Sequence, residues 1–283
     1  MTAPDGPPPD LTLALELADL ADEMALARYG APDLAVETKA DRTPVTDVDK
    51  AIEELLRRRI GSSRPGQAIV GEEGGDGGCG AGASTRWVLD PIDGTKNYVR
   101  GVPVWGTLIG LERDGQGVLG VVSAPALARR WFATAGGGAW SGTSWWARHR
   151  LRVSSVGDLS RASLSYDSVV GFDQHGLLPG FLSLAHRCAR TRAFGDFWSH
   201  MLVAEGAIDV AVEPEVAHWD VAAVSVIVTE AGGRFSDLSG ATRTDGGSAV
   251  STNGVLHDAV LATLAPVAPT RSARPVAAAT SDG

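Results

Sequence analysis

The sequence of 283 residues contains only two cysteines, Cys79 and Cys188, and its formal net charge is -9. Two cysteines make neither a disulfide framework nor a metal-binding pattern, so we expect reduced thiols in a cytoplasmic protein. The negative charge argues against nucleic acid as a partner, because binding it generally requires a basic face. The same charge would repel an anionic substrate unless bound cations reversed the local field.

Long apolar runs are also missing. No run approaches the roughly 18 residues that indicate a membrane span. The N-terminus, MTAPDGPPPD, lacks the basic start and apolar run of a signal peptide. We therefore expect no membrane insertion and no export. The remaining composition, 44% hydrophobic and 21% charged, is that of an ordinary globular protein.

Apolar periodicity and turn residues predict alternating helices and strands. We expect disordered tails over residues 1–9 and 265–283, an N-terminal α+β lobe over 10–148 and a C-terminal α/β lobe over 149–264. The fold class is therefore α/β (α+β). The predicted helices cover about 11–29, 46–61, 177–188, 196–206, 219–233 and a last segment from 255; the predicted strands cover 67–71, 86–90, 104–125 as a hairpin, 129–135, 162–166, 190–194, 207–213, 234–238 and 248–252.

Three glycines, Gly115, Gly117 and Gly120, have the GxGxxG spacing of dinucleotide-binding loops. That fingerprint requires a strand before the glycines and a helix after them. Here a second strand follows, so we assign these glycines to the hairpin, with its turn at Asp114-Gly115. The sequence therefore does not predict a dinucleotide site.

Acidic side chains stand where regular elements end. Asp90 and Asp93 follow an apolar strand in WVLDPIDGTKNYVRG, Glu72 and Glu73 follow AIVG, and Asp220 lies in the first turn of a helix. Singly, Asp220 could be a helix-terminal charge and Glu73 a solvated side chain. Together, clustered carboxylates would repel one another unless cations neutralised them. Because the set offers oxygen ligands only, hard cations are favoured over zinc.

The turn after Asp90 has a second use. Pro91 fixes its own backbone and favours an irregular turn, which would let both aspartates and the Ile92 carbonyl face a metal site. Gly94 permits close backbone approach, and Gly94-Thr95 opens a helix-like segment whose free N–H groups could hold a phosphate. Metal ions beside a phosphate seat indicate metal-assisted phosphoryl transfer to water.

These motifs resemble the inositol monophosphatase-like family of magnesium-dependent, lithium-sensitive phosphatases. VGEE, VLDPIDGTKNY and HWDVAAVSVIVTEAGG stand in the family's order and spacing, and the likeness runs from about Leu11 to Leu264. Through NYVRGVPVW and RAFGDFWSHMLVAEGAIDVAVEP the chain is most similar to the actinobacterial histidinol-phosphate phosphatases. The resemblance implies a layered α-β-α-β-α sandwich of the inositol monophosphatase and fructose-1,6-bisphosphatase type, and a homodimer.

The resemblance also implies residue roles and two or three Mg²⁺ ions per active site. Glu72, Asp90 and the Ile92 carbonyl would bind one ion, Asp90, Asp93 and Asp220 a second, and a third would share Glu72. Thr95 would orient the attacking water, held by Asp47, with Glu72 as the base. The substrate's phosphate would contact Asp93, Asp220 and the amides of Gly94 and Thr95. The alternatives are a simple N-cap for Thr95 and a helix-start charge for Asp47.

Substrate choice depends on residues before the fourth predicted helix. Where inositol-directed relatives commonly have Arg-x-x-Gly-Ser-Ala, this chain has Arg192-Ala-Phe-Gly-Asp196, and Glu213 is retained. Two carboxylates suit a leaving group that carries an ammonium and an imidazole, as histidinol does. Asp196 could instead only cap its helix. Arg192 would contact the substrate or brace the pocket, unless it is a surface residue.

Three functions stay open at this stage. The chain could hydrolyse histidinol phosphate, or apply the same chemistry to inositol 1-phosphate or another sugar phosphate. Because some relatives of this fold bind the transcription machinery, it could also act mainly as a binding partner. A small-molecule phosphate monoester is the expected partner of the first two.

Overall fold

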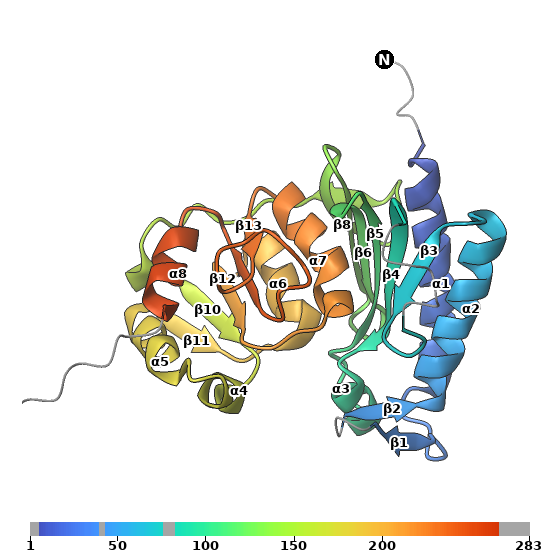
Figure 1. The fold of residues 1–283 in the computed structure, drawn as a ribbon, viewed down its shortest axis with the longest axis horizontal. Coiled ribbons are helices and arrows are strands. Elements are labelled where there is room, and N and C mark those ends of the chain that lie inside the picture. The colour runs from blue at the N-terminus through green and yellow to red at the C-terminus, as the bar shows by residue number, and fades with distance from the viewer. Residues whose placement is uncertain (1–5, 40–42, 76–82, 266–283) are drawn as a thin grey trace, which may run out of the picture.

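The computed structural model describes residues 6–39, 43–75 and 83–265 as two mixed lobes joined by a layer of helices (Figure 1). None of the helices within these ranges is both long and apolar enough to cross a bilayer. The parts of the predicted tails over 1–5 and 266–283 lie outside the described residues, as does Cys79.

The first lobe is built on a sheet with the strand order β3-β4-β5-β6-β7-β8-β9 in the described chain. Its strands are β3 (Ala68–Gly71), β4 (Thr85–Asp93), β5 (Gly106–Arg113), β6 (Gln116–Ala124), β7 (Arg129–Thr134), β8 (Gly138–Gly142) and β9 (Arg148–Arg150). Only β3 and β4 of these neighbours run parallel. One face is covered by α1 (Pro9–Arg28) and α2 (Asp47–Ser63), whose Leu17 and Ile52 share a core with Ile109 and Val121.

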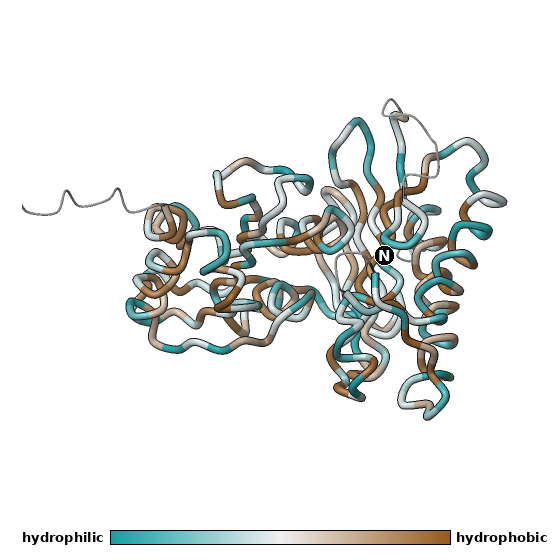
Figure 2. Tube along the Cα trace, turned by 60° about the horizontal axis from the view of Figure 1, so that its bottom comes forward, coloured by the Kyte–Doolittle hydropathy of each residue, from teal (hydrophilic) through white to brown (hydrophobic). Residues whose placement is uncertain are grey.

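The opposite face of this sheet packs on a middle layer of two helices, α6 (Asp196–Ala204) and α7 (His218–Glu230). Strand side chains alternate between faces, so Leu108 and Val122 point to this second core, where they join Met201 and Val224. Figure 2 shows hydrophobic residues along the strands of the first sheet, and hydrophobic and hydrophilic residues alternating along the helices that cover it.

The second sheet has the order β11-β10-β12-β14-β13 in the described residues. Its strands are β10 (Ser163–Tyr166), β11 (Arg190–Arg192), β12 (Val210–Glu213), β13 (Arg234–Ser236) and β14 (Ala249–Thr252). Its outer face carries α4 (Val169–Gln174), α5 (Leu178–Arg187) and α8 (His257–Leu264) around Leu164, Phe181 and Val260. The layers therefore follow one another as α-β-α-β-α, which confirms the expected fold class and sandwich (Figure 1).

Short elements complete the described chain. A separate two-stranded ribbon of β1 (Val36–Thr38) and β2 (Pro44–Thr46) precedes α2, and α3 (Thr95–Arg100) follows β4. Single 3-10 turns cover Pro125–Leu127 and Leu159–Arg161. Neither the β1–β2 ribbon nor β8, β9 and α4 was predicted from the sequence.

The hairpin of β5 and β6 turns at Asp114-Gly115, as predicted, with both residues at positive φ. The GxGxxG glycines belong to this hairpin, and two of them face α7. A Cβ on Gly117 would lie 2.7 Å from Val226 Cγ2, and one on Gly120 would overlap the backbone of Ala223. These glycines let a helix lie close to a sheet, which accounts for the motif without a helix after it.

Candidate active site

A cavity of about 670 Å³ opens between β4, α3, α4, α6, β12 and the start of α7. It gathers nine of the residues predicted from the sequence to act in catalysis or binding. They are Glu72, Asp90, Ile92, Asp93, Gly94, Thr95, Asp196, Glu213 and Asp220. Asp47 and Arg192 are not among the lining residues.

A break in the register of β4 places the two aspartates in the cavity. Asp90 pairs with Leu108 and Asp93 with Gly106, so two residues of β4 bulge where the partner strand has one. The bulge contains Pro91, whose carbonyl accepts a hydrogen bond from Thr107 Oγ1 at 2.8 Å. The strand therefore continues past Pro91 with a bulge where we expected a turn. This geometry lets both carboxylates reach the same cavity.

The chain then reverses at Gly94, which has φ +82°. A Cβ at this position would lie 2.9 Å from the Val104 carbonyl oxygen, so glycine is required by both conformation and space. Gly94 is the N-cap of α3 and Thr95 its first residue, so Thr95 is not the N-cap of the alternative interpretation. Thr95 Oγ1 lies 3.0 Å from the Ile92 carbonyl oxygen.

Carboxylates crowd the cavity strongly enough to perturb one another. Burial raises the pKa of Asp90 well above its ordinary value, and the nearby charges of Glu72 and Asp93 raise it further. Burial and the charge of Asp196 do the same to the pKa of Asp93. Burial raises the pKa of Asp220 to about 7, although its carboxylate accepts a hydrogen bond from Ala217 N–H. The site is therefore short of positive charge.

These side chains fit a hard cation by their chemistry. All are oxygen ligands, and Asp90 Oδ1 is buried with no hydrogen-bond partner among the described residues. No three acidic or imidazole side chains in the described parts of the chain already surround one point. Like charges repel, and Glu72 instead pairs with Lys39, so a cation would have to draw the ligands together.

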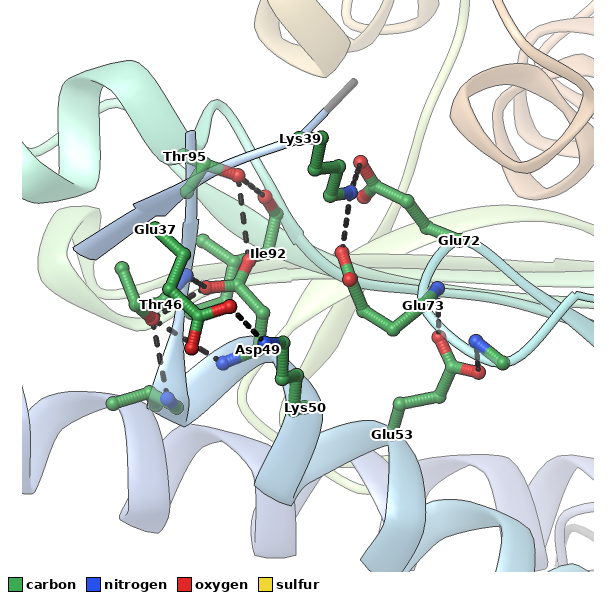
Figure 3. A network of polar contacts seen from close by, with 12 residues as sticks. Glu37, Lys39, Thr46, Asp49, Lys50, Glu53, Glu72, Glu73, Ile92 and Thr95 are labelled. Atoms are coloured by element: carbon green, nitrogen blue, oxygen red, sulfur yellow. Dashed lines mark hydrogen bonds and ion pairs between the residues drawn. The ribbon is translucent and has the colours of Figure 1, made fainter. Parts of the chain in front are cut away.

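The residue that contacts Thr95 is Asp49, and the prediction of Asp47 was wrong. Thr95 Oγ1 donates to Asp49 Oδ1 at 3.3 Å (Figure 3). Asp49 is the third residue of α2, and its other oxygen accepts from Thr46 N–H at 2.9 Å in a capping box. Asp47 starts the helix with its side chain half exposed, 4.0 Å from Arg28. Asp49 can contact Thr95 because its carboxylate turns back over the N-terminus of α2, with one oxygen on Thr46 and the other on Thr95.

The turn that carries Glu72 and Glu73 is held by hydrogen bonds to a side chain of α2. Buried Glu53 accepts hydrogen bonds from Glu73 N–H at 2.7 Å and Gly74 N–H at 2.8 Å (Figure 3). Lys39 Nζ lies 2.7 Å from Glu72 Oε1 and 2.5 Å from Glu73 Oε1. Burial lowers the pKa of Lys39, but the two carboxylates outweigh it and the net shift is upward. Glu73 is thus an ion-paired residue, and the solvated interpretation was wrong.

The wall between α6 and β12 holds further acids. Asp196 is the first residue of α6, whose N-cap is Gly195, so the cap-only alternative does not describe it. Its Oδ2 accepts from Asn97 at 2.9 Å, and burial together with Glu213 raises its pKa to about 7. Asp93 Oδ2 accepts the Phe197 N–H of the same helix instead, at 2.7 Å.

Two residues missed in the sequence complete this wall, Asp167 and His200. Burial and the charge of Glu213 raise the pKa of Asp167. His200 Nε2 is 3.4 Å from Glu213 Oε1, and neither atom has a hydrogen-bond partner in the part of the chain that the structure describes. Asp167 directly follows the strand ASLSY, so its place at a strand end was a usable signal. His200 is inside an apolar helix and gave none.

Arg192 does not reach the cavity, contrary to the sequence-based prediction. It is an exposed residue of the edge strand β11, and its guanidinium donates to the Thr191 carbonyl at 2.7 Å. His218, which we did not predict as a ligand, pairs with Glu112 at 2.7 Å outside the cavity.

Comparison of the chain with known proteins identifies relatives of one phosphatase family. The family model described as the inositol monophosphatase family matches residues 9–268. A histidinol-phosphatase of Mycobacterium tuberculosis is 53% identical over 90% of this chain and 97% of its own length. One of Streptomyces coelicolor is 52% identical over 89% and 95%. An inositol-1-monophosphatase of Mycobacterium leprae is 37% identical over 82% and 85%. Among solved structures, the Thermotoga maritima IMPase superimposes with a TM-score of 0.78 at 29% identity, covering 90% of this chain and 96% of that one.

Proposed function

The chain belongs to the inositol monophosphatase family, and from that premise we propose that it is a metal-dependent phosphomonoesterase that converts L-histidinol phosphate to L-histidinol and phosphate. Such a reaction is a step of histidine biosynthesis. The two histidinol-phosphatase relatives are clearly more similar to it than the inositol-1-monophosphatase relative, which supports this substrate.

The proposed cofactor is Mg²⁺, as two or three ions per active site. Glu72, Asp90, Asp93, Asp220 and the Ile92 carbonyl would hold them, and all five line the same cavity. Bound Mg²⁺ supplies positive charge that offsets the carboxylates and polarises the phosphate ester. The raised pKa values of Asp90, Asp93 and Asp220 support this assignment, because such a cluster is costly to ionise without a cation.

Thr95 and Asp49 would orient the attacking water. The Thr95 hydroxyl donates its one hydrogen to the Ile92 carbonyl or to Asp49 Oδ1, at 3.0 and 3.3 Å, so its lone pairs can accept a hydrogen bond from water. Glu72 would act as the base that receives the water's proton. The backbone N–H groups of Gly94 and Thr95, where the chain reverses into α3, would hold the phosphate oxygens.

The observation that carries the substrate assignment is the number of acidic side chains on the cavity wall between α6 and β12. Asp196, Glu213 and Asp167 line the cavity in addition to the proposed metal ligands. Burial and the charge of Glu213 raise the pKa of Asp196 and of Asp167, although Lys96, which also lines the cavity, lowers both; this supports a need for further positive charge at this wall. An ammonium and an imidazole, as in histidinol, supply that charge, whereas the hydroxyl groups of inositol do not.

A phosphate-release assay tests the proposal. We expect kcat/KM for histidinol phosphate to exceed that for inositol 1-phosphate by roughly 10- to 150-fold, the worth of one charged hydrogen bond of about 1.5–3 kcal/mol. Activity should require Mg²⁺ and be lost with EDTA. A preference for inositol 1-phosphate would refute the substrate, and EDTA-resistant activity would refute the metal site.

We also propose that the enzyme is a cytoplasmic homodimer and is inhibited by lithium, in line with the family resemblance. Light scattering coupled to size-exclusion chromatography measures the assembly directly, and a lithium titration of the phosphate-release assay measures inhibition. A monomer at micromolar concentration, or activity indifferent to lithium, would contradict the respective proposal.

A further inference from the structure

The second glutamate of the VGEE motif, Glu73, has no task in the proposed reaction, yet it is the more buried of the pair. Its side chain is 10% exposed and that of Glu72 is 20% exposed. Both carboxylates contact one ammonium, Lys39 Nζ, at 2.5 and 2.7 Å (Figure 3). One cation is therefore shared by a proposed metal ligand and a neighbour that is not a ligand.

The backbone under this pair is fixed. Glu53, itself 2% exposed, accepts from the N–H groups of Glu73 and Gly74, and Arg57 Nε binds the same carboxylate at 2.7 Å. A Cβ at Gly71 or Gly74 would collide with Glu53 or Arg57, so the turn fits closely over α2. With this turn held, Glu72 would leave Lys39 by rotation of its side chain.

We propose that Lys39 is an internal counter-ion that pairs with Glu72 before a divalent cation binds, and that Glu73 retains Lys39 when Glu72 turns to the cation. Lys39 and Glu73 are then positioning residues that together set the affinity of the Glu72 site for Mg²⁺. This inference rests on the proposed metal site.

The exchange has a physical reason. While it is paired with Glu72, Lys39 competes with Mg²⁺ for the same carboxylate. Once Glu72 has left, a partly buried ammonium without a partner would be unfavourable. Glu73 removes that penalty, and because it is less exposed than Glu72, its attraction for Lys39 is less screened by solvent. Without Glu73, Lys39 would hold Glu72 more firmly.

The test is a double-mutant cycle of Glu73→Asp and Lys39→Met, with Mg²⁺ binding measured by titration calorimetry. Glu73→Asp keeps the charge but shortens the side chain by one methylene, so its carboxylate should no longer reach Lys39. When Lys39 is present, we expect Glu73→Asp to raise the Kd for Mg²⁺ by about five- to tenfold. In the Lys39→Met background, the same substitution should raise it by less than about twofold. Lys39→Met alone should bind Mg²⁺ more tightly than the wild type.

Glu37→Asp is the matched control. It is the same substitution two residues from Lys39, but Glu37 is 72% exposed and pairs with Lys50, so Mg²⁺ binding should not change. Thermal unfolding in EDTA should be close to wild type for all variants, which separates positioning from lost structure. The inference would be overturned if Glu73→Asp weakened Mg²⁺ binding equally in both backgrounds or in neither. It would also be overturned if Lys39→Met bound Mg²⁺ no more tightly than the wild type. If the wild type binds no Mg²⁺ at all, the proposed metal site fails as well.

Discussion

Replacing Asp49 with Asn should remove most activity while leaving the protein folded. One oxygen of Asp49 accepts from the N–H and the hydroxyl of Thr46, and the other accepts from the Thr95 hydroxyl at 3.3 Å. In Asn, the carbonyl oxygen can keep the Thr46 contact, but the amide group then faces Thr95 as a donor. The Thr95 hydrogen then has only the Ile92 carbonyl as acceptor, and the Thr95 oxygen accepts from the Asn amide, so one of its lone pairs is no longer open to water.

The size of the effect differs for rate and for stability. A misplaced catalytic group costs on the order of 100-fold in rate, or about 2.7 kcal/mol of activation free energy. The loss of the hydrogen bond with the Thr95 hydroxyl costs about 1 kcal/mol of unfolding free energy. Burial raises the pKa of Asp49, so the neutral amide also removes an unfavourable buried charge and offsets part of that loss. We therefore expect kcat to fall about 100-fold and the free energy of unfolding to change little.

Steady-state kinetics and thermal unfolding of Asp49→Asn and Asp47→Asn test which of the two aspartates positions Thr95. Asp47 is half exposed and lies outside the cavity, so its Asn variant should keep nearly the wild-type kcat. If Asp47→Asn lost as much activity as Asp49→Asn, the assignment of Asp49 would be wrong. An Asp49→Asn enzyme with unchanged kcat and reduced stability would make Asp49 a helix cap only.

Three further predictions concern the acids of the cavity. Asp220→Asn should keep the fold but lose most activity even at saturating Mg²⁺, and a near wild-type rate there would exclude Asp220 as a ligand. The pKa values of Asp196 and Asp220 are raised from 3.8 to about 7, so between these pH values the folded metal-free protein binds more protons than the unfolded chain. Its Tm in EDTA should therefore fall as pH rises from about 4 to 7. Mg²⁺ should raise the Tm more at about pH 7.5 than at about pH 5.5. A flat profile would contradict that coupling. Asp196→Ser should lower kcat/KM for histidinol phosphate more than for inositol 1-phosphate, without changing Mg²⁺ dependence; an unchanged ratio would remove Asp196 from the specificity argument.

Much of the fold followed from the sequence because long elements carry a clear period. The helix predicted over 11–29 is observed as Pro9–Arg28, and the Asp114-Gly115 turn is where the hairpin reverses. The β1–β2 ribbon could not be predicted, since each strand has three residues and β1 is exposed throughout, with no apolar alternation to reveal it. The bulge at Pro91 also escaped, because proline alone does not distinguish a bulge from a turn.

The site was less predictable where one residue has two contacts. Thr46 and Asp49 have the sequence spacing of a capping box, which accounts for Asp49 as a helix cap and gives no sign of its contact with Thr95. Glu73 was taken as solvated because its partner, Lys39, is 34 residues away in the sequence. Pairings of this kind depend on tertiary structure, which a linear pattern does not contain.

The glycines of the β5–β6 hairpin have a consequence for mutational scans of this enzyme. Gly110, Gly117 and Gly120 bring the sheet against α7, and α7 begins beside the cavity with Asp220 in its first turn. A methyl group added at Gly120 would push the helix outward at Ala223, one turn from Asp220, and carry that carboxylate away from Asp90. Such a substitution would score as a loss of catalysis in a screen although it touches no substrate. A mutational scan of the enzyme should therefore show a row of positions that tolerate no substitution, Gly110, Gly117 and Gly120, on the face of the sheet that packs against α7.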